Sequence, residues 1–399
     1  MRNAAFVAGA RAAWSAAQGL DAPADESLSQ TLERTGWVRT LGGVAGYLAL
    51  SARNRNATVE RVTAAVAAGD IGVSPAVRGC IYLVPRAHEA LALRIAHRLS
   101  QRRIAKEQEK LAITDAELDA LGAAVLALVN EQPLSTARLR KALPDGAIRS
   151  LGDAGKKMGL TSTLPPALRR LEFAGRVRRI PVDARLDHER YVWSPHDLDV
   201  GDAREQDVAD ITALYLRWAG PSTRREVAAW TGLSQTQAKK GLADCGARMA
   251  GLNGEVVFAL GTSTAPATGH VALLPAMDNL FAMRSSAELL VEPAYHPVPV
   301  AHFGPGRRST LAQMRRPIER TIVRDGALVG LWAVDPVTQE VVTTLTPSAG
   351  KVQLDAEIQR VNAVMDAVGS CRVFSIDTDK RLAQRADRLR GLEWPGGTA

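Results

Sequence analysis

Residues 161–194 read TSTLPPALRRLEFAGRVRRIPVDARLDHERYVWS, and this stretch decides the predicted fold. Ser162 or Thr163 can cap a helix whose first turn tolerates two prolines, because a first-turn N–H has no intrahelical partner. The leucines of LPPALRRL recur at i, i+4 and i+7, which predicts one apolar stripe. Arg169 and Arg170 point away from that stripe, and the glycine at 175 ends the helix.

Two short strands, RVRRIPV and ERYVWS, follow this helix around the polar turn DARLDH. Their β-branched and aromatic residues favour strands, and Arg178, Arg179 and Arg190 lie on them. A helix with an arginine face followed by an arginine-rich hairpin predicts a winged helix, with the helix in a groove of duplex DNA and the hairpin on phosphates. The alternative is an ordinary helix and hairpin whose arginines are only solvated.

The overall composition favours a folded, basic protein. The 399 residues are enough for two to four domains, and the net charge of +8 favours an acidic partner, usually nucleic acid. The charge is mostly arginine, which suits bidentate contacts to phosphate and guanine. Three scattered cysteines lack metal-ligand spacing, so we expect no metal, disulfide or cofactor. The N-terminus has neither a membrane span nor a secretory core, which predicts a cytoplasmic protein with no membrane partner.

The chain divides into four predicted domains with an α+β fold of tandem winged helices followed by a small C-terminal β domain. The boundaries are 1–110, 111–200, 201–262 and 263–399, and the first domain includes a charged connecting helix from 85 to 110. In the second domain TDAE at Thr114 is a predicted capping box, and Ser135 caps the next helix. In the last domain alternating strands surround the Asp325-Gly326 turn, and two helices finish the chain.

The third predicted domain repeats the plan of the second. TRRE and SQTQ are capping boxes at the starts of its second and third helices, and an Asn-Gly turn predicts a hairpin after them. Gln235, Gln237, Lys239 and Lys240 occupy the exposed start of the predicted recognition helix. The alternative is an inert helix-turn-helix that packs on protein.

Motifs of the common enzyme classes are absent from the sequence. LGGVAG lacks the Rossmann glycine spacing and a P-loop lysine, and there is no GxSxG elbow or HExxH. The seven histidines do not cluster at ligand spacing. These absences disfavour a conventional hydrolase or oxidoreductase and leave a basic array of winged helices.

Four segments give the chain a resemblance to a known family. They are YLALSAR (47–53), RGCIYLVP (78–85), LLPAMDNLFAMR (273–284) and RDGALVGLW (324–332). In order and separation they resemble the YcaQ/AlkZ-type DNA glycosylases, which excise bulky alkylated bases and unhook interstrand crosslinks. The resemblance covers nearly the whole chain. It implies three winged helices, a C-terminal β domain, double-stranded DNA as partner and N-glycosidic hydrolysis.

The resemblance fails at the catalytic motif. The family carries glutamine, any residue, then glutamine or aspartate before the YLAL-like helix, and its spacing puts Arg39 and Leu41 there. Glycosidic cleavage needs an acceptor that holds water against the anomeric carbon, and neither arginine nor leucine provides one. A base alkylated on N7 is already cationic and leaves without a general acid. Tyr82 also stands where histidine is common in the family.

Three other side chains are candidates for holding the water. Glu33 and Asp278 carry carboxylates, and Gln30 carries an amide oxygen. The alternatives are that Gln30 and Glu33 are exposed helix residues and that Asp278 caps a turn.

Trp37 and Arg39 suggest another use of the same loop. An indole ring can stack on a displaced base, and the guanidinium can hold a phosphate. The alternative is that Trp37 belongs to the core.

Three functional hypotheses follow. The first is a monomeric glycosylase-family protein that recognises alkylated or crosslinked purines, with or without turnover, along a concave arginine-lined face. The second is a transcription regulator or architectural protein that binds DNA without chemistry. The third is an interaction scaffold whose winged helices pack on protein.

Overall fold

The fold was analysed in a computed structural model. The structure describes residues 4–40, 42–261, 264–301, 309–315, 318–373 and 377–396. The candidate Leu41 lies outside the described residues.

The first unit, residues 4–111, combines five helices with a small antiparallel sheet. The helices are α1 (Ala4–Ala17), α2 (Leu28–Thr35), α3 (Ala45–Ser51), α4 (Val59–Ala68) and α5 (Arg86–Leu111). The strands β1 (Val38–Arg39), β2 (Ile71–Pro75) and β3 (Ile81–Pro85) pair in the order β1-β3-β2. β2 was not predicted, because IGVSP carries a glycine, a serine and a proline instead of an apolar alternation.

The second unit, residues 115–195, contains four helices and a three-stranded sheet. They are α6 (Asp115–Glu131), β4 (Leu134–Ser135), α7 (Thr136–Ala142), α8 (Gly152–Lys157), α9 (Leu164–Phe173), β5 (Val177–Pro181) and β6 (Tyr191–Pro195), with strand order β4-β6-β5. The apolar face of α9 packs on α6, as its leucine stripe predicts. Its other faces contact α5, and β5 contacts β2.

The third unit, residues 206–259, has three helices and a hairpin. They are α10 (Gln206–Ala219), α11 (Arg224–Thr231), α12 (Gln235–Asp244), β7 (Arg248–Leu252) and β8 (Glu255–Ala259). Both predicted capping boxes are present, at Thr223 with Glu226 and at Ser234 with Gln237. The Asn253-Gly254 turn joins the two strands as predicted.

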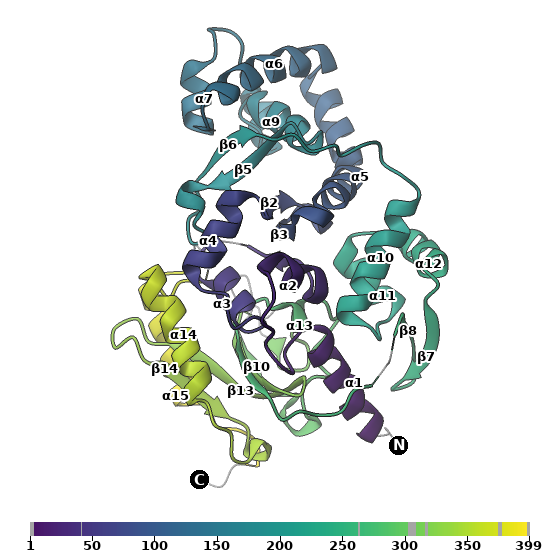
Figure 1. The fold of residues 1–399 in the computed structure, drawn as a ribbon, viewed down its shortest axis with the longest axis vertical. Helices are drawn as coiled ribbons and strands as arrows, with labels where there is room; N and C mark the ends of the chain where they lie inside the picture. The colour runs from purple at the N-terminus through teal and green to yellow at the C-terminus, as the bar shows by residue number, and fades with distance from the viewer. Residues whose placement is uncertain are drawn as a thin grey trace.

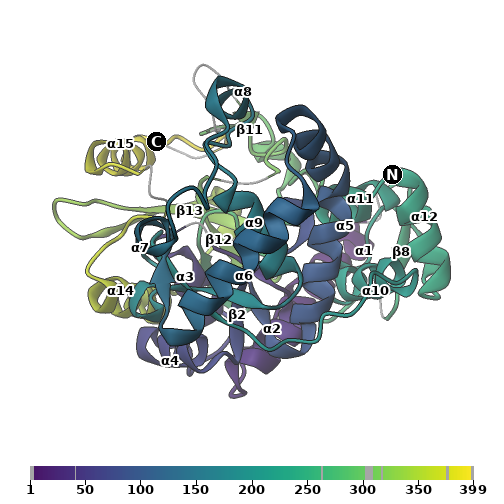
Figure 2. The same cartoon turned by 90° about the horizontal axis from the view of Figure 1, so that it is seen from above.

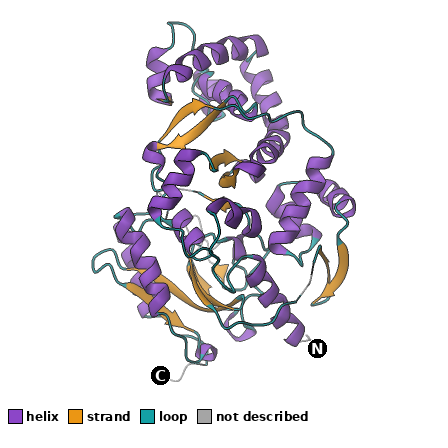
Figure 3. Cartoon of the chain, in the orientation of Figure 1, coloured by secondary structure: helices purple, strands orange, loops and turns teal. Residues whose placement is uncertain are grey.

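The C-terminal region contains a four-stranded antiparallel sheet in the order β14-β13-β12-β9. Its elements are β9 (Val271–Leu274), α13 (Asn279–Ala282), β10 (Pro299–Val300), β11 (Ser309–Thr310), β12 (Arg320–Arg324), β13 (Ala327–Val334), β14 (Val341–Leu345), α14 (Asp355–Val368) and α15 (Asp379–Arg390). Figure 1 shows the second unit at the top, the first in the middle, the third to the right and this region at the lower left. The fold is mixed α+β, as predicted, with strands confined to small separate sheets (Figure 3).

The hydrophobic cores run across the boundaries of these units. One cluster joins Leu48 and Leu83 of the first unit to Leu273 and Trp332 of the C-terminal sheet. Another joins the first unit to the third through tryptophans. Seen from above (Figure 2), α14 and α15 flank one side of the molecule and the third unit the other. The first unit is therefore held from both sides by elements far away in sequence.

Two predicted caps differ from the structure, both because of Arg149. Thr114 caps α6, but Arg149 binds the Glu117 carboxylate at 2.8 Å, so the reciprocal bond of a capping box does not form. Thr163 precedes α9 without capping it, because its hydroxyl accepts the Arg149 backbone N–H at 3.1 Å.

Candidate active site and DNA-binding surface

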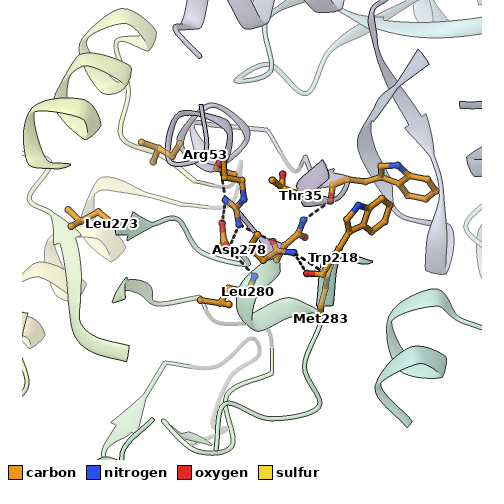
Figure 4. A network of polar contacts seen from close by, with 12 residues as sticks. Thr35, Arg53, Trp218, Leu273, Asp278, Leu280 and Met283 are labelled. Carbon is orange, nitrogen blue, oxygen red and sulfur yellow. Dashed lines mark hydrogen bonds and ion pairs between the residues drawn. The ribbon is translucent and has the colours of Figure 1, made fainter. Parts of the chain in front are cut away.

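A buried ion pair joins two of the segments singled out in the sequence. Arg53, at the end of YLALSAR, donates from both terminal nitrogens to the two carboxylate oxygens of Asp278, each at 2.8 Å. Both side chains are fully buried. Asp278 also caps α13 by accepting the Leu280 N–H at 3.0 Å (Figure 4). A bidentate, desolvated pair of this kind fixes geometry strongly.

This pair belongs to a larger network that connects three parts of the molecule. Arg53 also donates to the Gln18 side-chain oxygen at 3.1 Å, and the Gln18 amide donates to the Trp218 carbonyl at 2.6 Å (Figure 4). Asn279, next to Asp278, donates to the Trp37 carbonyl at 3.0 Å. α1, α10 and the LLPAMD segment are thereby held against the turn that leads into β1.

Asp278 is therefore not available to hold a water, contrary to the prediction. Both of its oxygens are occupied, and its side chain has no contact with solvent. The cap suggested as the alternative is its observed role. Its partner Arg53 could not be inferred because 225 residues separate the two.

The position equivalent to the family's catalytic motif lies on β1. Arg39 pairs with Tyr82 in the β1–β3 register. Its guanidinium is half-buried, contacts the Met277 sulfur at 3.6 Å and has a buried Nε without a hydrogen-bond partner. Arg78 donates to the Tyr82 hydroxyl at 2.6 Å. Two guanidinium groups thus lie beside Tyr82, whose phenol pKa is raised by burial.

Trp37 is a core residue and cannot stack on a DNA base, so its predicted binding role is wrong. Its ring is fully buried and lies 5.5 Å from the Trp218 ring and 6.2 Å from the Trp230 ring. Its indole N–H donates to Nδ1 of His88 at 3.2 Å. The aromatic cluster fastens the first unit to the third, which is the alternative raised for Trp37.

Glu33 and Gln30 both lie on α2 but differ in what they contact. The exposed Gln30 side chain accepts the Ser27 N–H at 2.9 Å and completes a capping box. Glu33 is half-buried, and its carboxylate accepts only a long hydrogen bond of 3.4 Å from Ser29. Its negative charge acts on His88, so it lies near the aromatic cluster. Of the three predicted acceptors, Glu33 has the most spare acceptor capacity among the described contacts.

The arginines of the second unit are mostly paired with carboxylates. Arg169 binds Glu107 of α5 at 2.5 Å, and Arg170 binds Asp115 of α6 at 2.5 Å. Arg179 binds Glu172 at 2.5 Å and also lies over the rings of Tyr191 and Trp193. The predicted arginine face of α9 is neutralised because α9 packs between two helices that supply acids.

The remaining predicted contacts of the second unit are also altered. Thr163 is fully buried, so its predicted DNA contact is wrong. Arg178 is half-buried and covers the end of α4, where a Cβ on Gly69 would meet its Nη1 at 2.3 Å. Arg190 alone among these residues is exposed without an ion pair in the part of the chain that the structure describes.

The third unit presents an exposed basic surface. Lys239 is exposed, while Lys240 binds Asp244 at 2.6 Å. Gln235 accepts from Arg224 at 3.2 Å, and Gln237 is engaged in its capping box. A groove of about 400 Å³ runs between α11, α12 and β8. It is lined by Thr223, Arg224, Arg225, Gln235, Glu255, Val256 and Phe258.

The sequence analysis did not single out Arg78, Arg225 or Arg248. Arg225 and Arg248 are exposed and form no ion pair among the described residues. Arg225 lines the groove together with Val256, and Arg248 is the first residue of β7. On the same hairpin, Met249 is 74% and Val256 59% exposed. Nothing in the sequence distinguishes a paired arginine from a free one.

Among the described residues, no group of three or more His, Cys, Asp or Glu side chains is arranged to hold a metal ion. Among the same residues, no helix combines the length and apolarity needed to cross a bilayer.

Comparisons with known proteins give the chain a family context. A sequence model of the family described as DNA glycosylase AlkZ-like matches residues 32–371. No curated protein matches the sequence. Among solved structures, Streptomyces sahachiroi DNA glycosylase AlkZ is 19% identical, with a TM-score of 0.68 over 94% of this chain and 99% of that chain. At this identity, the structural likeness shows a shared fold.

Proposed function

This chain belongs to the AlkZ-like DNA glycosylase family, and we propose that it recognises bulky N7-alkylated purines in duplex DNA and cleaves their N-glycosidic bonds. The observation that carries the proposal is the family match together with the buried ion pair between Arg53 and Asp278. This ion pair joins two of the segments that resemble the family, and Asn279, next to Asp278, holds the residue before β1 through the Trp37 carbonyl.

The substrate class follows from what the candidate site lacks. The Arg39 guanidinium only donates hydrogen bonds and does not deprotonate, and the Asp278 carboxylate is buried in an ion pair with Arg53. A site of this kind offers little acid catalysis to a neutral leaving base. An N7-alkylated purine carries its own positive charge and leaves as a neutral base, so only the attacking water needs a protein acceptor.

Glu33 is our candidate for that acceptor. Its carboxylate is half-buried and its single side-chain hydrogen bond is long, which leaves lone pairs for a water. Two residues, Gly36 and Trp37, separate α2 from β1, so Glu33 precedes Arg39 by six positions in the chain. The position of Glu33 is also stabilised by its backbone carbonyl, which accepts the Trp218 indole N–H at 2.8 Å.

We infer that duplex DNA is bound mainly by the third unit, through a winged-helix arrangement of α10–α12 with the β7–β8 hairpin as the wing. Arg225, Lys239 and Arg248 are exposed and free of carboxylates among the described residues, so they are available to phosphates. The exposed Met249 and Val256 suit contact with sugars or a base step in the minor groove.

The test is a glycosylase assay on a duplex with one N7-methylguanine, using the wild type, Glu33→Gln and the surface control Glu131→Gln, an exposed carboxylate at the end of α6. We expect abasic product from the wild type and the control, and loss of product with retained lesion binding in Glu33→Gln. If the wild type binds the lesion selectively but forms no product, the proposed recognition stands and the proposed cleavage is refuted. Equal affinity for lesion and undamaged duplex, or preference for one undamaged sequence, would refute the proposal in favour of a regulator.

The Arg39→Gln variant sharpens this test. It restores the amide that the family carries at this position, an acceptor that can hold water. We expect product formation to rise above the wild-type rate, and an unchanged rate would mean that Arg39 is not what limits turnover.

A further inference from the structure

We propose that Arg39 and Arg78, which both lie beside the buried Tyr82 phenol, form an anion subsite that holds one backbone phosphate of the DNA next to the damaged nucleotide. This inference rests on the proposed lesion-recognition function and extends it. It assigns a binding role to the position where the family carries a water-holding side chain.

The first argument is that two positive charges share this place without a negative one. Arg39 is the register partner of Tyr82 across the β1–β3 pair, and Arg78 donates to the Tyr82 hydroxyl at 2.6 Å. Both guanidinium groups act electrostatically on the Tyr82 phenol. Neither forms an ion pair within the described ranges. Like charges that are partly removed from water repel each other, so an anion placed between them is favoured.

The second argument is that both arginines have unsatisfied donors. The Nε atoms of Arg39 and Arg78 are buried and have no hydrogen-bond partner. Arg39 otherwise contacts only the sulfur of Met277, a weak acceptor, at 3.6 Å. Donors left unpaired in a partly buried site are costly. Their remaining N–H groups are arranged as forks that suit phosphate oxygens.

The third argument is a contrast with other buried arginines in the same molecule. Arg53 is paired with Asp278, and Arg94 is paired with Asp207 at 3.0 Å. At those positions the chain supplies the carboxylate itself. At Arg39 and Arg78 it supplies a phenol and a thioether instead, which leaves both positive charges available to an external anion.

The site is also accessible from outside. Arg39 and Arg78 are half-buried, so part of each guanidinium reaches solvent. Gly79, beside Arg78, has a φ of 66° and open space where a Cβ would lie. The chain beside Arg78 is therefore open on the side of Gly79.

The test is a double-mutant cycle between protein and DNA charges. The probe is a duplex with one 2′-fluoro-N7-methylguanine, which resists hydrolysis, and single neutral methylphosphonates placed in turn at phosphates flanking the lesion. We expect one position at which the substitution weakens wild-type binding about tenfold, as for a lost charged hydrogen bond. At that position it should have little further effect on Arg39→Met or Arg78→Met.

The controls separate this proposal from the function on which it rests. Arg39→Lys keeps the charge and should retain part of the methylphosphonate effect, and Arg138→Met removes an exposed cation of α7 and should leave the effect unchanged. Thermal unfolding of each variant checks the fold. If the wild type prefers the lesion duplex but every methylphosphonate effect persists in Arg39→Met and Arg78→Met, the subsite is refuted and lesion recognition stands. If the wild type does not prefer the lesion duplex, the proposed function fails first.

Discussion

The second and third units follow the same order of helices and hairpin but use their basic side chains in different ways. In the second unit Arg169, Arg170 and Arg179 are bound to carboxylates. In the third unit Arg225 and Lys239 are exposed and unpaired among the described residues. The two units also attach differently to the first unit. The second does so partly through ionic contacts such as Arg169 with Glu107. The third does so through an aromatic cluster and through its own carboxylate Asp207, which binds Arg94 of α5.

An arginine-rich helix is therefore not by itself a DNA-binding helix. Between Arg149 and Trp193 the sequence has ten basic and five acidic residues, yet the arginines of α9 face acids supplied by α5 and α6. The third unit is fastened by tryptophans, so its cations are not needed for attachment. The following predictions test this division of labour.

The largest effect is expected from breaking a pair in the second unit with Arg179→Ala. Glu172 is only 3% exposed, so the substitution leaves a buried carboxylate without its partner. We expect the free energy of unfolding to fall by about 3–5 kcal/mol, measured by urea denaturation. The dependence of DNA affinity on salt should stay unchanged in the folded variant.

The matched control is the double variant Arg179→Met with Glu172→Leu, which removes both charges. It should recover most of the lost stability, because replacing a buried pair by apolar groups is often neutral. A reduced salt slope with unchanged stability would instead assign Arg179 to a phosphate.

The next effect concerns the third unit and is read from DNA binding. The triple variant Arg225→Ala, Lys239→Ala and Arg248→Ala removes three exposed cations. If each contacts a phosphate, the slope of log K against log salt concentration should decrease by about 0.9 per contact. Thermal stability should change little. A decrease of the salt slope on removing Arg169 and Arg170, together with an unchanged slope in the triple variant, would show that the second unit contacts the phosphates and the third does not.

A smaller effect should follow from releasing a cation in the third unit. Lys240 is held by Asp244 at 2.6 Å, and the Lys240 amine pKa is raised by that carboxylate. Asp244→Asn keeps the size of the side chain and frees the amine. We expect the salt slope to steepen by up to about 0.9. An unchanged slope in fluorescence anisotropy titrations would place Lys240 outside the DNA contact.

Much of the fold could be predicted from local patterns. The caps at Thr223 and Ser234, the Asn253-Gly254 turn and the leucine stripe of α9 depend on neighbours within a few residues, so the sequence contains the information directly. β2 was missed because its pairing with β3 makes a strand of residues that have little strand preference of their own.

The candidate site was predictable only in part. The family resemblance located Arg39 and identified LLPAMD, but the role of Asp278 depends on Arg53, 225 residues away in the chain. Likewise, the burial of Trp37 depends on tryptophans of the third unit. Whether an ionisable or aromatic side chain is available for function is a property of its partners across the fold, which local spacing does not reveal.

The smallest expected effect is on the pKa values of two histidines of α5. These values distinguish how the second and the third unit attach to that helix. Burial lowers the pKa of His88, which contacts Trp37 and Trp218, and also that of His97, which stacks on Phe173. Because the pKa is lowered in the folded state, the contribution of each histidine to the free energy of unfolding is fully present above its ordinary pKa of 6.5. This contribution is lost as the pH falls from 6.5 toward the lowered value. Each histidine can contribute at most about 1.4 kcal/mol per pH unit.

Salt should separate these two histidines, because their charged neighbours differ. After burial, the largest influences on the His97 pKa are Arg169 and Arg170, which lower it further, whereas His88 has Glu33, which opposes the shift. Raising the ionic strength screens these charges. In NMR titrations we expect the pKa of His97 to rise with salt and that of His88 to fall slightly or stay constant, with His88→Asn and His97→Asn assigning the signals. Parallel shifts of both pKa values would mean that the second and third units attach to α5 by the same kind of contact.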